Sequence, residues 1–336
     1  MKIDNFDLEN DILVVAEIGN NHEGSYSLGE EMVGLSAESG VNAVKFQTFK
    51  TESYISRKEK DRYNRLKSFE LSYDEFEKLS KVANNCGLIF LSTPFDIESA
   101  HFLNTIVPAF KIASGDNTFF PLIETIASFA KPILLSTGMI EIEQLKKTLT
   151  FINKTWEKNN INEQICILHC TSAYPTPINE VNLSVIQSLK KVLNCAVGYS
   201  DHTLGIDAAV LSVAFGARVI EKHFTINKNY SDFPDHQLSA DPKDMADLVK
   251  KVQLIKKLIG NSEKLIQPSE ELNIIAARRS IVAKRNLSKG TKIKWEDLNW
   301  VRPGNGLPPG TENLIVGKVL SEQVKIGELI NENLLL

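Results

Sequence analysis

Short apolar runs recur along the chain, and each run ends on polar or small residues. Eight such runs can be marked, and they are rich in Val, Ile, Leu and Phe. They are ILVVAEIGNNH from Ile12, NAVKFQT from Asn42, LIFLSTPF from Leu88, AFKIASGD from Ala109, PILLSTGM from Pro132, CILHCTSAYP from Cys166, CAVGYSDHT from Cys195 and ARVIEKHFT from Ala217. Short runs of this composition predict buried β-strands.

The segments between these runs carry apolar residues at helical spacing. The pattern predicts helices over 27–40, 73–87, 141–156 and 241–260. Eight strand–helix alternations within roughly 260 residues predict an α/β fold of the (β/α)8 TIM-barrel type rather than an open doubly wound sheet. No GxGxxG or GxxxxGK[ST] motif follows any run, which argues against a dinucleotide-binding or P-loop fold.

The pattern changes in the last quarter of the chain, which is polar through NSEKLIQPSEELN. Two similar pieces follow, KGTKIKWEDL and IGELINENLL, each with Gly, then Ile three residues on, then Leu eight residues after the Gly. The Gly- and Pro-rich VRPGNGLPPG between them indicates a structured loop. We expect a barrel domain over 1–265, a linker over 266–280 and a compact, turn-rich β domain over 281–336.

Composition narrows the setting of the protein. The residues are 43% hydrophobic and 24% charged, as in ordinary globular proteins, and the net charge of -4 gives no reason to expect nucleic acid or an anionic membrane as a partner. MKIDNFDLEN lacks the apolar core of a signal peptide, and no run of about 20 apolar residues occurs. The four cysteines (Cys86, Cys166, Cys170 and Cys195) have no CxxC spacing, so we expect reduced, mostly buried thiols in a cytoplasmic protein.

Polar side chains gather at the carboxyl ends of the predicted strands, where the reactive residues of such barrels lie. These strand ends carry Glu17, Asn20, His22, Lys45, Gln47, Ser92, Thr93, Lys111, Ser114, Ser136, Thr137, Thr171, Ser172, Tyr174, Ser200, Asp201, His202, Glu221 and His223. In the last run, strand alternation directs Glu221 and His223 to one face and Lys222 to the other. One charged strand end could be solvated, but eight polar ends that meet at one barrel mouth predict a site.

Two lysines and two histidines stand out within this set. Lys45 and Lys111 are flanked by apolar residues, so each predicts a partly buried ammonium that needs an anion, and the hydroxyls of Thr93, Ser114, Ser172 and Ser200 would complete a phosphate or carboxylate site. The alternative for each lysine is a surface residue whose stem packs on the protein. His202 and His223 end neighbouring strands and suit two imidazole ligands of one divalent metal, or else hydrogen-bonded structural histidines. We expect His169 to be structural and His101 to lie on a helix surface.

The same strand ends resemble the sialic acid synthase family, the phosphoenolpyruvate-dependent synthases of nine-carbon nonulosonic acids. The matching stretches are AEIGNNHEGS, VKFQT, STPFD, KIASGD, PLIETIASFAKPILLSTGM, LHCTSAYPTP, GYSDHT and IEKHFT. In the tail, RRSIVAKRNLSKG and VRPGNG resemble the family's C-terminal antifreeze-like (SAF) domain. The resemblance covers nearly the whole chain.

This resemblance implies a TIM barrel plus an antifreeze-like domain, in a domain-swapped homodimer whose small domain closes the partner's barrel mouth. It implies that phosphoenolpyruvate is held by Lys45, Thr93, Lys111, Ser114, Ser172, Tyr174 and Ser200. His202 and His223 would bind a divalent metal, Mn²⁺ first and Mg²⁺ or Co²⁺ as alternatives. Glu17, Gln47, Asp235 and Arg302 would contact the N-acyl aminosugar, with Arg302 supplied by the other subunit. Either Glu17 or Glu221 would orient or deprotonate the attacking water.

Three departures from the family pattern concern the acceptor sugar. Ser172 stands where some members have Asn, the segment after the second strand, KTESYISRKEKDRYNRLKSFELS, is shorter than in some members, and Phe233 replaces the Gly of the usual Gly-Pro-Asp-His. The acceptor therefore stays open among N-acetylmannosamine, its 6-phosphate and a 2,4-diacetamido-2,4,6-trideoxymannose.

Two other functions compete with this interpretation. One is another phosphoenolpyruvate aldol synthase, which makes a seven- or eight-carbon keto acid on a similar barrel; the antifreeze-like tail argues against it. The other is a non-catalytic carbohydrate- or ice-binding protein, which would leave His202 and His223 without a purpose.

Overall fold

The computed structural model describes residues 1–336, and each of the eight apolar runs forms a strand of one parallel sheet. The strands are β3 (Leu13–Gly19), β4 (Ala43–Thr48), β5 (Ile89–Pro94), β6 (Phe110–Ile112), β7 (Ile133–Ser136), β8 (Ile165–Cys170), β9 (Ala196–Asp201) and β10 (Val219–His223). Their order in the sheet is β5-β4-β3-β10-β9-β8-β7-β6, and β5 and β6 lie side by side where the sheet closes. The predicted (β/α)8 barrel is confirmed.

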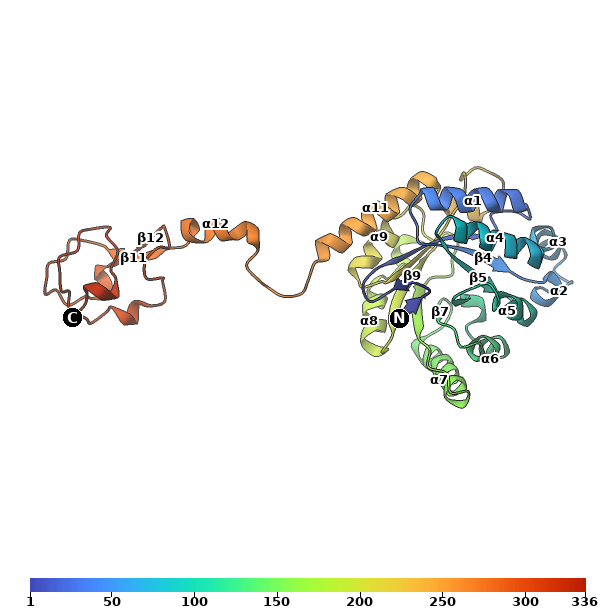
Figure 1. Cartoon of the computed structure of the whole chain (residues 1–336), viewed down its shortest axis with the longest axis horizontal. Coiled ribbons are helices and arrows are strands. Elements are labelled where there is room, and N and C mark those ends of the chain that lie inside the picture. The colour runs from blue at the N-terminus through green and yellow to red at the C-terminus, as the bar shows by residue number, and fades with distance from the viewer. The chain divides into compact units, whose positions relative to one another are not determined.

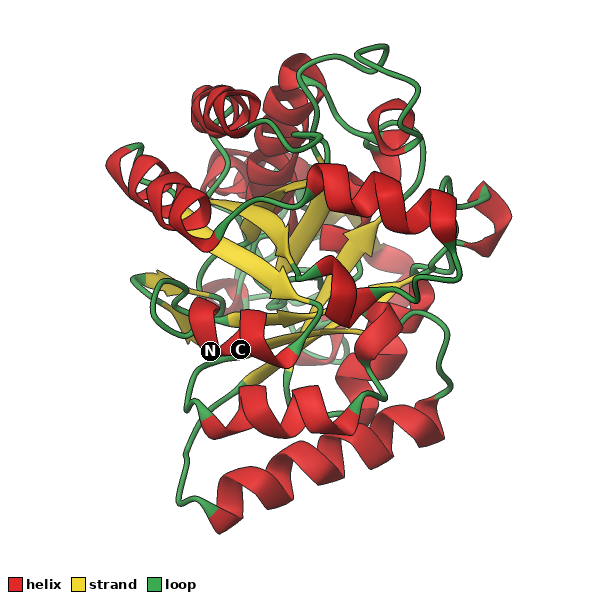
Figure 2. Cartoon of the chain, turned by 90° about the vertical axis from the view of Figure 1, so that its right-hand side faces the viewer, coloured by secondary structure: helices red, strands yellow, loops and turns green.

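Helices surround this barrel, as the red ribbons around the yellow strands show (Figure 2). The main ones are α1 (Tyr26–Glu38), α4 (Tyr73–Asn85), α5 (Ile97–Leu103), α6 (Phe120–Ser128), α7 (Ile142–Lys158), α8 (Ser184–Val192), α9 (Asp207–Ala214) and α11 (Pro242–Ile259). The four helices predicted from periodicity match α1, α4, α7 and α11. Sequence signals also fix some ends: Ser72 and Glu75 form a capping box at α4, and Asp241 caps α11 just before Pro242.

Strand alternation sorts the barrel residues into an inner and an outer set. On β3, Val14 and Ala16 pack outward against the helices, whereas Leu13 and Val15 belong to a separate apolar cluster inside the barrel. A short hairpin of β1 (Lys2–Ile3) and β2 (Phe6–Asp7) packs on the inner cluster through Ile3. The next inward positions on each strand are the polar strand ends, so one alternation supplies both the core and the site.

The chain divides into two units, Met1–Gly260 and Asn261–Leu336. The second has its own core and an antiparallel pair, β11 (Ser280–Ala283) with β12 (Leu298–Val301), shown at the C-terminal end of the colour ramp (Figure 1). Its two similar pieces adopt the same local structure, a glycine with φ near 80° (81° at Gly290, 82° at Gly327) followed by a 3₁₀ turn, at Trp295–Asp297 and at Glu332–Leu334. The predicted small β domain is confirmed.

Several short elements were not anticipated. The segment after β4 folds into α2 (Thr51–Tyr54) and α3 (Lys60–Phe69), and α10 (Asp235–Leu238) lies in the segment after β10. The stretch 266–280, expected to be a linker, carries α12 (Pro268–Ala277), which has no buried residue.

The state of the cysteines and the character of the helices can be compared with the predictions of reduced, mostly buried thiols and of no long apolar run. All four cysteines are free; Cys166 and Cys170 are buried as expected, whereas Cys86 is exposed at the end of α4 and Cys195 is half-buried. None of the helices combines the length and apolarity needed to cross a bilayer.

Candidate functional site

The inward positions at the carboxyl ends of four strands bring two ammonium groups and two carboxylates into one buried network. Lys45 Nζ lies 2.7 Å from Glu17 Oε2 and 3.7 Å from Glu221 Oε2. Lys111 Nζ lies 3.7 Å from the other oxygen of Glu221, Oε1. All four side chains are at least 90% buried, so this network is a built feature of the barrel and not a solvated surface cluster.

Hydroxyl groups from the neighbouring strands complete the network. Lys45 Nζ donates a hydrogen bond to Thr93 Oγ1 at 3.0 Å, and Ser200 Oγ donates to Glu221 Oε1 at 2.8 Å. The structure thus brings together Glu17, Lys45, Thr93, Lys111, Ser200 and Glu221, six of the residues that the sequence singled out.

Burial and mutual attraction act in opposite directions on these groups. Burial raises the pKa of Glu17. Burial opposes ionisation of Glu221, but Lys111 and Lys45 outweigh this effect and hold the pKa of Glu221 below its usual value. Burial also opposes the charge of Lys45, yet Glu17 and Glu221 raise its pKa, whereas burial prevails at Lys111 and lowers its pKa. Of the two lysines of the network, Lys111 is therefore the one whose charge the neighbouring carboxylates compensate less.

The two histidines face each other beside this network, with ring centroids 5.4 Å apart. Tyr174 packs on His202 with centroids 4.2 Å apart, and His202 Nδ1 lies 3.2 Å from the Thr171 carbonyl oxygen. His223 Nδ1 is buried and has no hydrogen-bond partner, and burial holds the pKa of His223 well below its usual value. A neutral imidazole with an unpaired buried nitrogen beside a second imidazole fits a divalent metal. No third His, Cys, Asp or Glu completes a protein-only ligand set, so such a site would stay open.

A second group of hydroxyls forms a corner around Gly138, after β7. Ser114 Oγ accepts a hydrogen bond from the Gly138 amide at 3.1 Å. A Cβ atom at Gly138 would lie 2.1 Å from Ser172 Oγ and 2.7 Å from Ser114 Oγ. The two predicted anion-binding hydroxyls therefore meet at a point that only glycine leaves free.

The residues predicted for the acceptor sugar fall into two groups. Gln47 Nε2 donates to Glu17 Oε1 at 3.2 Å, and Asn20 in turn donates to Gln47 Oε1 at 2.9 Å, so Glu17 and Gln47 belong to the mouth. Asp235 begins α10. Burial raises the pKa of its carboxyl, and the nearby His202 opposes part of this rise. Arg302 is exposed and belongs to the other unit, Asn261–Leu336.

Sequence reasoning missed Asp116, two residues after Ser114. Its Oδ2 atom is buried without a hydrogen-bond partner, and burial raises the pKa of Asp116 to about 6, with Lys111 opposing the shift. The available signal was its place in KIASGD, four residues after the end of β6, the strand that carries Lys111. By contrast, the predictions for two other histidines are confirmed: His169 Nε2 bonds the Val181 carbonyl at 2.8 Å, and His101 is exposed on α5.

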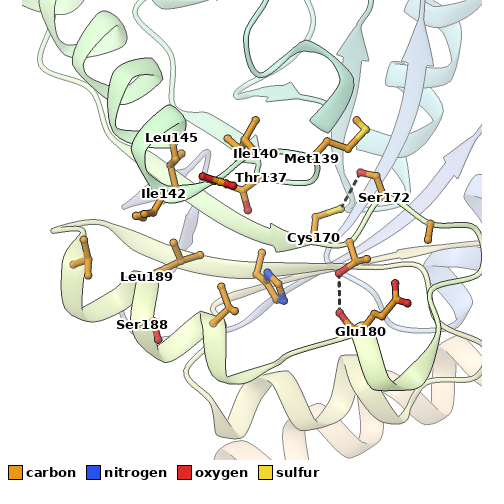
Figure 3. A pocket seen from close by; sticks show the side chains of 16 residues that line it. Thr137, Met139, Ile140, Ile142, Leu145, Cys170, Ser172, Glu180, Ser188 and Leu189 are labelled. Atoms are coloured by element: carbon orange, nitrogen blue, oxygen red, sulfur yellow. Dashed lines mark hydrogen bonds between the residues drawn. The ribbon is translucent and has the colours of Figure 1, made fainter.

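A cavity of about 780 Å³ lies beside the mouth, lined by residues of α7, α8 and the loops after β7 and β8. Figure 3 shows Met139, Ile142, Leu145 and Leu189 on its apolar wall, with Cys170 and Ser172 at one end. The ion-pair network lines none of it. The charged chemistry of the site is therefore separate from this apolar space.

Comparison with known proteins decides the family. A model of the NeuB family matches residues 32–264, more than half of the chain, and a model of the SAF domain matches residues 278–336. The chain belongs to the sialic acid synthase family. It is 39% identical to the N,N'-diacetyllegionaminic acid synthase of Campylobacter jejuni over 95% of this chain and 99% of that protein. It is 44% identical to an uncharacterized protein of Methanocaldococcus jannaschii over 94% of this chain and 92% of that protein.

A solved structure of the sialic acid synthase family agrees. The N-acetylneuraminic acid (sialic acid) synthetase of Leptospira borgpetersenii superposes with a TM-score of 0.76 at 32% identity, over 82% of this chain and 94% of that one. The relatives with named activities are synthases, so this member of the sialic acid synthase family is an enzyme of the synthase type.

Proposed function

We propose that the protein condenses phosphoenolpyruvate with an N-acylated aminohexose of the N-acetylmannosamine type and releases a nonulosonic acid and phosphate. The observation that carries this proposal is the buried Lys45–Glu221–Lys111 network at the barrel mouth, with hydroxyls on both sides. Two buried ammonium groups beside hydroxyl donors suit a small ligand with both a phosphate and a carboxylate.

Phosphoenolpyruvate would lie between the two lysines and the hydroxyl corner. Lys111 has no anion closer than 3.7 Å, so an incoming anion would complete its surroundings. Further contacts would come from Thr93, Ser114, Ser172, Tyr174 and Ser200.

The acceptor sugar would lie on the Glu17 side of the mouth. Glu17 and Gln47 are already joined by a hydrogen bond, and His202 is close enough to Asp235 to oppose the rise that burial causes in the pKa of its carboxyl. In a homodimer with swapped small domains, Arg302 of a second copy would supply a guanidinium for the N-acyl carbonyl oxygen. We propose a cytoplasmic setting because Cys166 and Cys170 keep free thiols.

The histidine pair completes the proposal. His202 and His223 would hold a divalent ion, Mn²⁺ first and Mg²⁺ or Co²⁺ as alternatives, and this ion would polarise the aldehyde oxygen of the open-chain sugar. The imidazole of His223, whose Nδ1 is unpaired and whose pKa burial holds well below its usual value, is the feature that supports it.

The chain's own groups account for the remaining chemistry. C3 of phosphoenolpyruvate attacks the aldehyde carbon, a C–C bond forms as the C=O π bond breaks, and the former aldehyde oxygen takes up a proton and becomes a hydroxyl. Water then adds to the electron-poor C2. The tetrahedral intermediate then collapses with cleavage of the C2–O bond, and the bridging oxygen leaves in phosphate. Lys45 and Lys111 stabilise the negative charge in a water-excluded pocket, and Glu17 or Glu221 takes the proton from the water.

A second acceptor is favoured by one observation. The 39% identity to a N,N'-diacetyllegionaminic acid synthase supports 2,4-diacetamido-2,4,6-trideoxymannose as an alternative to N-acetylmannosamine. A third possibility, an aldol synthase of shorter keto acids, predicts turnover with arabinose or erythrose phosphates.

One assay separates these functions: phosphate release from phosphoenolpyruvate with a divalent metal and each sugar offered alone. We expect release only with an N-acyl aminohexose, and turnover with arabinose or erythrose phosphate instead would overturn the proposal. With phosphoenolpyruvate labelled at the bridging oxygen, the label should appear in phosphate; label in the sugar acid would exclude C–O cleavage.

Metal dependence is tested in the same assay. Exhaustive chelation should abolish turnover, and His223→Ala should lower kcat by at least about a hundredfold while the protein stays folded by circular dichroism. Full turnover of the chelated protein would contradict the metal role of the histidines.

A further inference from the structure

A second buried ion pair lies on the opposite face of the strands that carry the histidines. Lys222 Nζ lies 3.0 Å from Asp201 Oδ2, and neither side chain is exposed at all. The two residues are direct partners in the register of β10 and β9, so they project from the same side of the sheet. Because Lys222 alternates with Glu221 and His223, this side faces away from the mouth.

Burial of this ion pair costs free energy, so its presence calls for a specific role. Removing two charges from water costs several kcal/mol per ion, and an apolar pair of the same size is often as stable. Lys222 makes no ion pair with the carboxylates of the mouth. The pair is therefore not part of the anion site.

The contacts of the pair converge on the backbone around His202. Lys222 Nζ also donates to the Thr203 carbonyl oxygen. Asp201 Oδ1 accepts from the Thr203 amide at 2.9 Å and from the Tyr199 hydroxyl at 3.2 Å. The residues before and after His202 are thus both tied to Lys222, which itself directly precedes His223.

The histidine rings have few anchors of their own on the mouth side. His223 Nδ1 has no hydrogen-bond partner, and His202 Nδ1 has two long contacts, with the Thr171 carbonyl oxygen at 3.2 Å and with Cys170 Sγ at 3.7 Å. Two imidazole nitrogens can share a metal only if their backbones stay within a few tenths of an ångström of the right spacing. On the mouth side, the Ser200–Glu221 hydrogen bond joins β9 and β10 two residues before each histidine. The contacts that act on the residues directly next to His202 and His223 lie on the opposite face, in the Lys222–Asp201 pair.

We propose that the Lys222–Asp201 pair is a positioning device that sets the separation of His202 and His223, and so the affinity of the site for a divalent metal. This inference rests on the metal site of the proposed function. Lys222 and Asp201 touch neither metal nor substrate; they act through the two adjacent residues of the chain.

The test is Mn²⁺ binding to the full-length protein without substrates, followed by the electron paramagnetic resonance signal of free Mn²⁺. Lys222→Met keeps the length of the side chain and removes its charge. We expect its Kd for Mn²⁺ to rise by about ten- to a hundredfold, the range usual for groups that orient metal ligands, and we take a fivefold rise as the lower limit. A rise below fivefold overturns the inference.

A matched control separates positioning from general loss of stability. Lys131 is half-buried and donates to two backbone carbonyls, those of Asn104 and Val107, far along the chain from either histidine. Lys131→Met should lower stability yet leave the Kd for Mn²⁺ within twofold. A fivefold loss of affinity in this control would mean that the effect is not specific to the pair, and would also overturn the inference.

A double variant covers the case in which Lys222→Met fails to fold because Asp201 is left unpaired. Lys222→Met with Asp201→Asn leaves no buried charge, and the Asn oxygen can still accept from the Thr203 amide and the Tyr199 hydroxyl, so this variant can approach wild-type stability. It should still show the fivefold or greater rise in Kd. Near wild-type affinity in this folded variant would refute the positioning role.

The proposed metal site is tested separately by the wild type and His223→Ala. If the wild type binds no Mn²⁺, or His223→Ala binds it unchanged, the metal site itself is wrong. If His223→Ala loses Mn²⁺ and the Lys222 variants keep it, only the positioning role is wrong.

Discussion

At the scale of single residues, the mouth of the barrel is defined by which positions alternate inward. Lys45, Lys111 and Glu221 follow apolar residues that fill the inner cluster, and their burial joins them in one network. A charged residue inside an apolar run is a signal that a sequence displays openly. Asp116 gives no such signal, because it follows the strand in a polar segment and its burial depends on side chains that pack from elsewhere.

The carboxyl of Asp116 should lower the free energy of unfolding once the pH is high enough for it to lose its proton. Its pKa of about 6 in the folded protein exceeds the ordinary value of 3.8, so the unfolded chain loses the proton more readily. The cost therefore grows as pH rises from 3.8 and is complete above about 6. Asp116→Asn should raise the free energy of unfolding, with a gain about 1 kcal/mol larger at pH 8 than at pH 5 after allowance for partial exposure.

Urea unfolding at the two pH values measures this gain. The exposed Asp232→Asn is the control and should show no such difference. An equal gain for Asp116→Asn at both pH values would show that ionisation of the carboxyl carries no cost.

Gly138 should control the hydroxyl corner rather than the fold. A Cβ atom there would collide with the mobile ends of Ser172 and Ser114, which can rotate away without a large loss of stability. Gly138→Ala should therefore raise the KM for phosphoenolpyruvate by about tenfold, the loss of one hydrogen bond to a charged group, with a small change in melting temperature.

Steady-state kinetics with Gly115→Ala as the control checks this expectation. A Cβ at Gly115 meets nothing within 4 Å, so its KM should stay within twofold of the wild type. An unchanged KM in Gly138→Ala would mean that the two serines do not contact phosphoenolpyruvate.

At the scale of elements, a helix or strand is easier to predict from the sequence when more of its residues are buried. The sequence predicts each strand from β3 to β10, because nearly all residues of these strands are buried and the residues before the polar strand end are apolar. The helix α3 escapes prediction because only Leu66 and Phe69 are buried in KDRYNRLKSF. The same reason applies to α12, whose Leu272 is 92% exposed.

The two similar pieces of the small unit predict a matched pair of glycine effects. Gly290 and Gly327 have φ of 81° and 82°, and a Cβ at either position would meet nothing, so only backbone strain opposes a side chain. Gly290→Ala and Gly327→Ala should each lower the stability of the small unit by about 1 kcal/mol.

Urea unfolding followed by the fluorescence of Trp295 and Trp300, in a Trp156→Phe background, reports on this unit. Gly34→Ala is the control, because Gly34 lies in α1 with open space around its Cβ position. It should leave the small unit unchanged and stabilise the barrel by about 0.5–1 kcal/mol. If the control lowers the small unit's stability equally, the strain argument fails.

At the scale of the whole molecule, the barrel and the C-terminal unit each have a hydrophobic core of their own, so the chain forms two compact units. The polar stretch after α11 and the repeated Gly-Ile-Leu spacing predict this division from sequence. The proposed contribution of the small unit to the site is less visible in the sequence, because it would depend on one exposed arginine, Arg302. The loop that carries Arg302 is nevertheless well fixed: Gly304 N donates to the Ile275 carbonyl at 2.7 Å, and Ser280 Oγ bonds the Pro303 carbonyl at 2.6 Å. Such a loop presents its side chain at little further entropic cost.

Arg302 should act on a second copy if the proposed domain-swapped homodimer is correct. Arg302→Ala should raise the KM for the aminosugar by at least about tenfold, with the KM for phosphoenolpyruvate within twofold, because a guanidinium bonds the N-acyl oxygen and not the phosphate. The exposed Lys289→Ala should change neither.

Complementation between Arg302→Ala, which is impaired at aminosugar concentrations well below its KM, and the inactive Lys111→Ala tests whether this arginine works across the dimer. A hybrid of one Arg302→Ala chain and one Lys111→Ala chain contains one mouth with both residues intact only if the arginine comes from the partner. Equal mixing after unfolding and refolding should then restore about a quarter of the wild-type activity, since half the dimers are hybrids and each has one complete site. Verified hybrids without activity would show that Arg302 serves its own chain or has no role in the reaction. Recovery in hybrids of Lys45→Ala with Lys111→Ala, two residues of the same mouth, would show instead that the refolded sample contains wild-type enzyme.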